Sequence, residues 1–177
     1  MAIKVVSVFG SSRTRPGTPE WKQAESWGKT LAGLGYAVAS GGYGGSMEAV
    51  SRGAKAAGGL VLGVTAPDLF KSRSGANSHI DLELPAPTLT GRIERMLEIS
   101  RACLALPGGL GTLTEISVAW NLAYIQRLQG ERPLPVGVSA EWRPLLKPHL
   151  QISPAELDLL TFIDSLADLK EFLGRLD

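Results

Sequence analysis

Residues 102–115 read ACLALPGGLGTLTE, and this stretch decides the fold. Its first five residues are apolar throughout, as in a strand that is buried on both faces of a parallel sheet. A turn with three glycines follows, and residues 110–128 then predict a long helix. A buried strand, a glycine-rich turn and a helix in succession are typical of α/β proteins, which bind ligands at the carboxyl ends of their strands.

Short apolar runs and amphipathic stretches alternate on both sides of this segment. We expect strands at 3–9, 36–39, 60–64, 79–84, 102–106, 135–139 and 161–163, and helices at 20–34, 46–57, 89–100, 110–128, 142–150 and 166–176. This alternation predicts a Rossmann-like, doubly wound and mostly parallel sheet of about six or seven strands with helices on both faces. Proline and glycine are scattered rather than gathered in a linker, so residues 1–177 are expected to form a single domain. The polar segment 66–78 is expected to be a mobile loop.

The composition is typical of a globular protein. The chain has 177 residues, of which 44% are hydrophobic, and its formal net charge is +1. The near-neutral charge and the lack of a dense basic run argue against nucleic acid as a partner. No apolar run approaches the roughly 20 residues that span a bilayer, and the first residues lead directly into a strand pattern rather than a signal peptide. The single cysteine, Cys103, lies among apolar neighbours and is expected to be buried, so we expect a cytoplasmic protein without disulfides.

The turn after residue 106 is a predicted anion site. Its glycines allow backbone N–H groups to approach a ligand closely, and the helix that follows presents unpaired N–H groups and the positive end of its dipole. Phosphate is the usual guest of such a site. The sequence contains no G-x-x-x-x-G-K-[ST] string, and no dinucleotide fingerprint, because Thr114 stands where a third glycine of G-x-G-x-x-G would be.

Two other turns are expected at the same edge of the sheet. Ser11 lies in the turn Gly10-Ser11-Ser12, and Gly42 lies in the glycine-rich turn over residues 41–45. Because the carboxyl ends of parallel strands meet at one edge, all three turns are expected to converge there.

Three charged residues near these turns, Glu115, Arg92 and Arg95, each have two interpretations. Thr112 and Glu115 match an N-terminal capping box, S/T-x-x-E, but Glu115 can equally be a carboxylate beside a bound phosphate ester, and both roles can coexist. Arg92 and Arg95 are three residues apart on a predicted helix, where they either clamp a phosphate or a sugar hydroxyl or form a solvated face. His79 and His149 lack metal-ligand spacing and are expected to be structural or surface residues. The tryptophans lie on helix patterns and are expected to be packing residues rather than a stacking platform: Trp21, Trp27, Trp120 and Trp142.

Residues 107–115 match the PGGxGTxxE motif of the LOG (Lonely Guy) family, whose members were long labelled "possible lysine decarboxylase". The stretches 40–47, SGGYGGSM, and 8–12, VFGSS, also resemble that family, and the likeness covers about residues 3–128. The resemblance implies a phosphoribohydrolase, which releases the base from AMP or from a cytokinin riboside 5′-monophosphate. It implies no metal and no cofactor, and it implies a homodimer. A decarboxylase of this kind would use pyridoxal phosphate on a lysine, and no lysine stands beside the glycine-rich turns.

The resemblance also assigns roles to residues. Arg92 and Glu115 correspond to the family's catalytic pair. The phosphate site would consist of the backbone N–H groups of Gly108, Gly109, Gly111 and Thr112 with the Thr112 hydroxyl, and Ser11 and Gly42 would line the nucleoside side.

The sequence departs from the family pattern at four positions. Gly91, Ile93, Glu48 and Arg101 stand where glutamate, lysine, glycine and aspartate are usual in the family. Two alternatives stay open; the altered residues around Arg92 favour the first, and the near-neutral charge argues against the second. The first is a non-catalytic carrier of a nucleotide or of the molybdenum cofactor, and the second is a DNA-processing relative.

Overall fold

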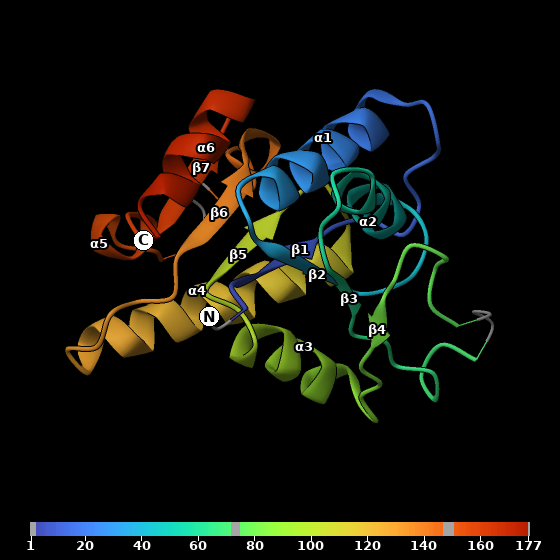
Figure 1. The fold of residues 1–177 in the computed structure, drawn as a ribbon. Coiled ribbons are helices and arrows are strands. Elements are labelled where there is room, and N and C mark those ends of the chain that lie inside the picture. Colours follow the sequence, from blue (N-terminus) through green and yellow to red (C-terminus); the bar gives the residue numbers. More distant parts are fainter. Residues whose placement is uncertain (1–2, 72–74, 147–150, 177) are drawn as a thin grey trace.

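The computed structural model describes residues 3–71, 75–146 and 151–176, and its seven strands form a single parallel sheet (Figure 1). The strand order is β4-β3-β2-β1-β5-β6-β7, and every neighbouring pair is parallel. The strands are β1 (Val5–Phe9), β2 (Ala37–Ser40), β3 (Val61–Gly63), β4 (Leu82–Glu83), β5 (Ala102–Ala105), β6 (Val136–Ser139) and β7 (Leu160–Ile163). The predicted Rossmann-like α/β fold is confirmed.

Helices cover both faces of the sheet (Figure 1). The helices are α1 (Pro19–Gly33), α2 (Ser46–Ala56), α3 (Leu89–Glu98), α4 (Leu110–Leu128), the short α5 (Pro154–Leu157) and α6 (Leu166–Gly174). Strand β5 shows how the two layers arise. Ala102 and Leu104 pack in the core with side chains of α1, α2 and α6, whereas Cys103 and Ala105 pack on the opposite face with α3 and α4. This alternation follows from the two-residue period of a strand, and each face requires an apolar helix to cover it.

The strand order places a topological switch point between β1 and β5. From β1 the chain proceeds through β2 and β3 to β4 at one edge, and it then returns to β5 on the other side of β1. The connections that leave β1 and β5 therefore diverge, and a crevice opens at the carboxyl ends of these two strands. The turn at residues 10–12 and the turn at residues 107–112 follow these two strands, so the fold places both turns at that crevice.

Two predicted elements differ from the structure. The strand expected at 79–84 is reduced to β4, a two-residue strand at the edge of the sheet. The Leu82 side chain is half exposed, so little burial stabilises a longer strand there. The helix expected at 142–150 is wrong over its described part, where a single 3-10 turn spans Ala140–Trp142. Pro144 lacks the N–H that a longer helix would need there. Residues 147–150, His149 among them, lie outside the described residues.

The core contains the aromatic residues and the cysteine that the sequence placed there. All four tryptophans and Cys103 are buried, as predicted. In the part of the chain that the structure describes, no helix is both long and apolar enough to cross a bilayer. The cytoplasmic location stays a prediction.

Candidate active site

The turns after β1 and β2 contact each other directly at the carboxyl edge of the sheet. The Ser46 N–H donates to the Ser11 carbonyl at 2.8 Å, and the Thr14 and Ser46 hydroxyls are 2.8 Å apart. Gly45 permits this approach, because its φ is +73° and a Cβ there would lie 2.2 Å from the Ser11 carbonyl oxygen. The predicted convergence of the turns is therefore present in the fold.

A cavity of about 300 Å³ opens between these turns and the turn after β5. The polar part of its lining, the polar wall, contains Ser11, Gly109, Gly111 and Thr112, and the apolar part contains Met47, Phe70, Leu89 and Ile93. Arg92 and Glu115 also line the cavity. A ligand with a phosphate at one end and a flat apolar group at the other end matches this distribution of side chains.

The polar wall is the N-terminus of α4. The N-cap is Gly109, which has no side chain to cap the helix, and the first backbone hydrogen bond runs from the Leu113 N–H to the Gly109 carbonyl. The preceding N–H groups thus lack an intrahelical acceptor. Thr112 is only 3% exposed and lines the cavity, and its hydroxyl has no hydrogen-bond partner among the described residues. A hydroxyl that lines the cavity and N–H groups without an intrahelical acceptor, at the positive end of a helix, form a site for an anion.

Arg92 projects from the first turns of α3 into the interior of the site. Its side chain is buried, and its Nε donates to the Val64 carbonyl at 2.7 Å. The guanidinium carbon lies 5.9 Å from the centroid of the Tyr43 ring and 6.0 Å from that of Phe70, within the range of cation–π attraction. These contacts fix the guanidinium, which is what a residue that orients a substrate requires.

Glu115 lies in α4 and faces Arg92. Arg92 Nη1 and Glu115 Oε1 are 3.4 Å apart, and Glu115 is 8% exposed. Burial raises the pKa of Glu115 to about 7, and the positive charge of Arg92 partly opposes this rise. A carboxyl group with a pKa near neutrality is suited to general acid–base chemistry.

The capping-box interpretation of Glu115 is wrong. Helix α4 begins at Leu110 with Gly109 as its N-cap, so Thr112 is already inside the helix and makes no capping hydrogen bond. The helix starts three residues before the position that a Thr112 cap would require, in agreement with the helix predicted at 110–128.

The other candidates are divided between the cavity and its surroundings. Arg95 is exposed, so the solvated-face interpretation holds for it and not for Arg92. Gly42 does not line the cavity, and its carbonyl accepts from the Asn77 N–H at 2.7 Å. Gly108 lies on the far side of the α4 turn, where it lines an adjacent hollow. The binding roles of Gly42 and Gly108 stay predictions.

Three residues of the site were not identified from the sequence. Met47, Tyr43 and Phe70 surround the Arg92 guanidinium, and Phe70 and Tyr43 form an edge-to-face pair with ring centroids 5.6 Å apart. Tyr43 and Met47 belong to the 40–47 stretch that resembles the family, and Phe70 belongs to the 66–78 segment, but neither pattern indicated a contact with Arg92. These contacts depend on tertiary packing.

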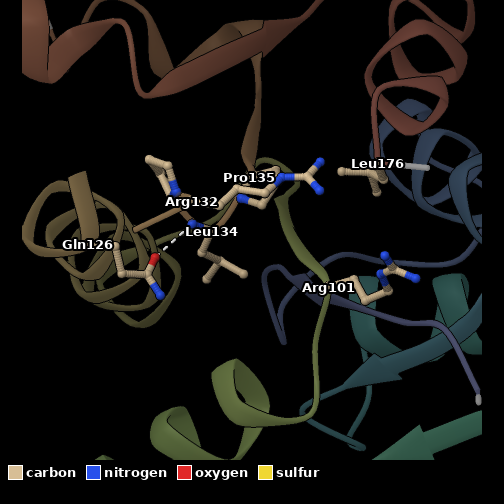
Figure 2. Close-up of a pocket in the computed structure, with 7 residues that line it drawn as sticks. Arg101, Gln126, Arg132, Leu134, Pro135 and Leu176 are labelled. Atoms are coloured by element: carbon tan, nitrogen blue, oxygen red, sulfur yellow. Dashed lines mark hydrogen bonds between the residues drawn. The ribbon is translucent and has the colours of Figure 1, made fainter. Parts of the chain in front are cut away.

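A second hollow lies at the opposite edge of the sheet and is unrelated to these groups. Arg101 directly precedes β5 and Pro135 directly precedes β6, so this hollow of about 230 Å³ is at the amino ends of the strands. Figure 2 shows Arg101, Arg132 and Leu176 around it, with the Leu134 N–H donating to Gln126 Oε1 at 2.7 Å. Within the described ranges, no group of three or more His, Cys, Asp or Glu side chains could hold a metal ion.

Comparison with known proteins agrees with the resemblance seen in the sequence. The model of a family described as the SLOG cluster4 family matches residues 3–127. A cytokinin riboside 5′-monophosphate phosphoribohydrolase from Mycobacterium tuberculosis is 30% identical over 151 residues, which cover 80% of this chain and 78% of that protein. The predicted relationship to the LOG family is thus confirmed.

Solved structures with the same fold include molybdenum-cofactor proteins. The molybdenum cofactor binding protein from Rippkaea orientalis has a TM-score of 0.77 at 22% identity, over 99% of this chain and 98% of that one. The molybdenum cofactor carrier protein from Chlamydomonas reinhardtii has a TM-score of 0.73 at 21% identity, over 98% of each chain. At these identities the likeness concerns the fold alone.

Proposed function

Because the chain belongs to the SLOG cluster4 family, we propose that it is a phosphoribohydrolase, which hydrolyses the N-glycosidic bond of a nucleoside 5′-monophosphate such as AMP or a cytokinin riboside monophosphate. The products are a free base and ribose 5-phosphate.

The two walls of the cavity give the substrate its orientation. The 5′-phosphate binds to the N–H groups at the start of α4 and to the hydroxyl of Thr112, where the helix dipole favours negative charge. The base lies on the apolar side, against Phe70 and Met47. Arg92 and Glu115 line the same cavity, where the ribose would lie between these two ends.

The proposed reaction is a displacement by water. As the C1′–N bond breaks, positive charge develops on the ribose, and the Glu115 carboxylate stabilises this charge. Glu115 takes a proton from the attacking water, whose oxygen bonds to C1′, while the base leaves with the electrons of the broken bond and takes up a proton. Arg92 holds the ribose in reacting geometry, since its guanidinium is fixed by Val64 and two aromatic rings.

The observation that carries this proposal is the buried Arg92–Glu115 pair in a cavity that also contains a helix N-terminus without a side-chain cap. The test is the release of ribose 5-phosphate from AMP and a panel of nucleoside monophosphates by the protein and by Glu115→Gln. We expect the variant to lose activity by about 10²- to 10⁴-fold, the usual contribution of a general base, and to retain its fold. Equal rates for the two proteins would rule out this role of Glu115.

A carrier is the second candidate. The same N–H groups of α4 would bind the phosphate of a molybdenum cofactor as well as that of a nucleotide, and Gly91 and Ile93 depart from the pattern that surrounds the catalytic arginine in the LOG family. Calorimetric binding of a nucleotide or of the cofactor, without release of ribose 5-phosphate from any nucleotide, would favour the carrier.

We also propose that the protein is a homodimer that associates through α3 and α4. A groove of about 770 Å³ between these helices has an apolar lining that includes Leu97, Val118 and Leu122. Val118 is 41% exposed and Leu89, at the start of α3, is 43% exposed. Leu89 lines both the groove and the catalytic cavity, so a partner in the groove would lie beside the site.

A further inference from the structure

A third hollow adjoins the candidate active site, beside the turn that precedes α4. Its volume is about 400 Å³, and Ser11, Arg13 and Gly109 belong to the walls of both spaces. Arg15 and Gly108 line only this adjacent hollow, which we call the outer hollow. The outer hollow is therefore a direct neighbour of the start of α4.

The outer hollow contains two positive side chains. The Arg13 guanidinium reaches over the α4 turn, because Arg13 Nη2 is 3.0 Å from the position that a Cβ would occupy at Gly109. Arg15 comes from the same segment, which connects β1 to α1. In the part of the chain that the structure describes, neither guanidinium forms an ion pair. Glu20 is the one carboxylate in the lining, and it lies in the first turn of α1, where the helix dipole stabilises it.

The groups at the outer hollow are those that bind phosphate oxygens. Arginine presents several N–H donors in a planar fork, and pairs of arginine with phosphate are among the strongest hydrogen-bonded contacts in proteins. A single phosphate monoester does not need these two arginines, because the N–H groups at the start of α4 and the Thr112 hydroxyl can already bind it.

We propose that the outer hollow is a second anion subsite, which binds the outer phosphate of a ligand that carries a pyrophosphate, such as a nucleoside 5′-diphosphate. The inner phosphate lies at the start of α4, and Arg13 and Arg15 bind the outer one. The inference rests on the proposed function in one respect, the place of the inner phosphate. Hydrolysis of a nucleoside diphosphate at this site would break the C1′–N bond, add water to C1′ and release the base with ribose 5-diphosphate.

The test compares AMP with ADP by isothermal titration calorimetry at low ionic strength, where exposed charges are least screened. We expect ADP to bind about tenfold more tightly than AMP, equivalent to about 1.4 kcal/mol. Arg15→Gln should remove most of this difference and leave the affinity for AMP unchanged, because Arg15 lines only the outer hollow. The matched control is Arg101→Gln, which removes an exposed arginine at the opposite edge of the sheet and should retain the preference for ADP.

The binding of inorganic pyrophosphate tests the second subsite independently of the proposed nucleotide substrate. Equal affinities for AMP and ADP, or an equal loss of both in Arg15→Gln, would overturn the second subsite. If neither nucleotide binds but pyrophosphate does so in a manner that depends on Arg15, the subsite stands and the proposed nucleotide substrate does not. Pyrophosphate binding that is unaffected by Arg15→Gln would again overturn the subsite.

Discussion

At the scale of single residues, the acidity of Glu115 links the site to the stability of the protein. Burial moves the pKa of this carboxyl from 4.5 to about 7, which means that the folded chain holds the proton more tightly than the unfolded chain. Arg92 opposes the rise, and Cys103, whose own pKa is raised mainly by burial and also by Glu115, adds no charge to the pair near neutrality. Ionisation of Glu115 therefore counts against the folded state.

The first prediction concerns Glu115→Gln and pH. Between pH 4.5 and 7 the folded wild type binds more protons at this position than the unfolded chain, so the contribution of Glu115 to the free energy of unfolding falls as the pH rises. The full loss, present above pH 7, is on the order of 3 kcal/mol. A neutral glutamine has no such dependence, so urea unfolding should show the variant gaining stability relative to wild type from pH 5 to pH 8. Glu131→Gln, at an exposed position, is the control and should follow the wild type. Parallel curves for wild type and Glu115→Gln would contradict the raised pKa.

At the scale of elements, the turn after β2 leaves room for the arginine of α3. A Cβ at Gly41 would lie 1.6 Å from Arg92 Nη2 and 2.6 Å from Met47 Sδ, so only glycine accommodates the observed position of the guanidinium. The glycine-rich second turn is thus a packing surface for Arg92. Under the proposed function, Gly41 is a positioning residue that acts on the substrate through Arg92.

The second prediction follows from this contact. Gly41→Ala should displace the Arg92 guanidinium by about an ångström, and displacements of that size cost about a hundredfold in rate. Gly44→Ala is the matched control in the same turn, because a Cβ there would meet only Glu48 Oε2, at 3.7 Å. The measurement is kcat/KM for ribose 5-phosphate release, with circular dichroism to verify the fold of both variants. Full activity in Gly41→Ala would show that the reaction does not depend on the observed position of the Arg92 guanidinium.

The elements also show what sequence patterns can and cannot reveal. Buried strands such as β1 and β5 were predicted because parallel strands covered on both faces are apolar throughout. Short elements were predicted less well: the strand expected at 79–84 is only the two-residue β4. Helix α5 was not predicted, although Ser153 and Glu156 form the capping box that starts it. Arg92 and Glu115 were identified through a motif, whereas the packing of Tyr43 and Phe70 on Arg92 joins residues from separate turns and leaves no local pattern.

At the scale of the whole molecule, the strands that hold the site and the strands near both ends of the chain belong to one sheet. All seven strands belong to this sheet, and the switch point between β1 and β5 lies in its interior, with three strands on the outer side of β1 and two beyond β5. We propose on this ground that residues 1–177 fold as a single domain. The crevice of the candidate active site, at the carboxyl ends of β1 and β5, then forms only when the whole sheet is folded.

The last prediction concerns the surface outside that sheet. The α3–α4 groove includes apolar side chains and shares Leu89 with the cavity of the candidate active site, so a second copy of the chain in the groove would bury Val118 and border the site. Val118→Asp places a charge in this interface, where it would lose its hydration without gaining a partner. Sedimentation equilibrium should therefore show a dimer for wild type and a monomer for the variant. Leu166→Asp is the control, since Leu166 is similarly exposed (42%) but begins α6 on the opposite face, where the helix dipole favours an acidic residue. A wild-type monomer, or a dimer that persists in Val118→Asp, would place the α3–α4 groove outside any self-association surface.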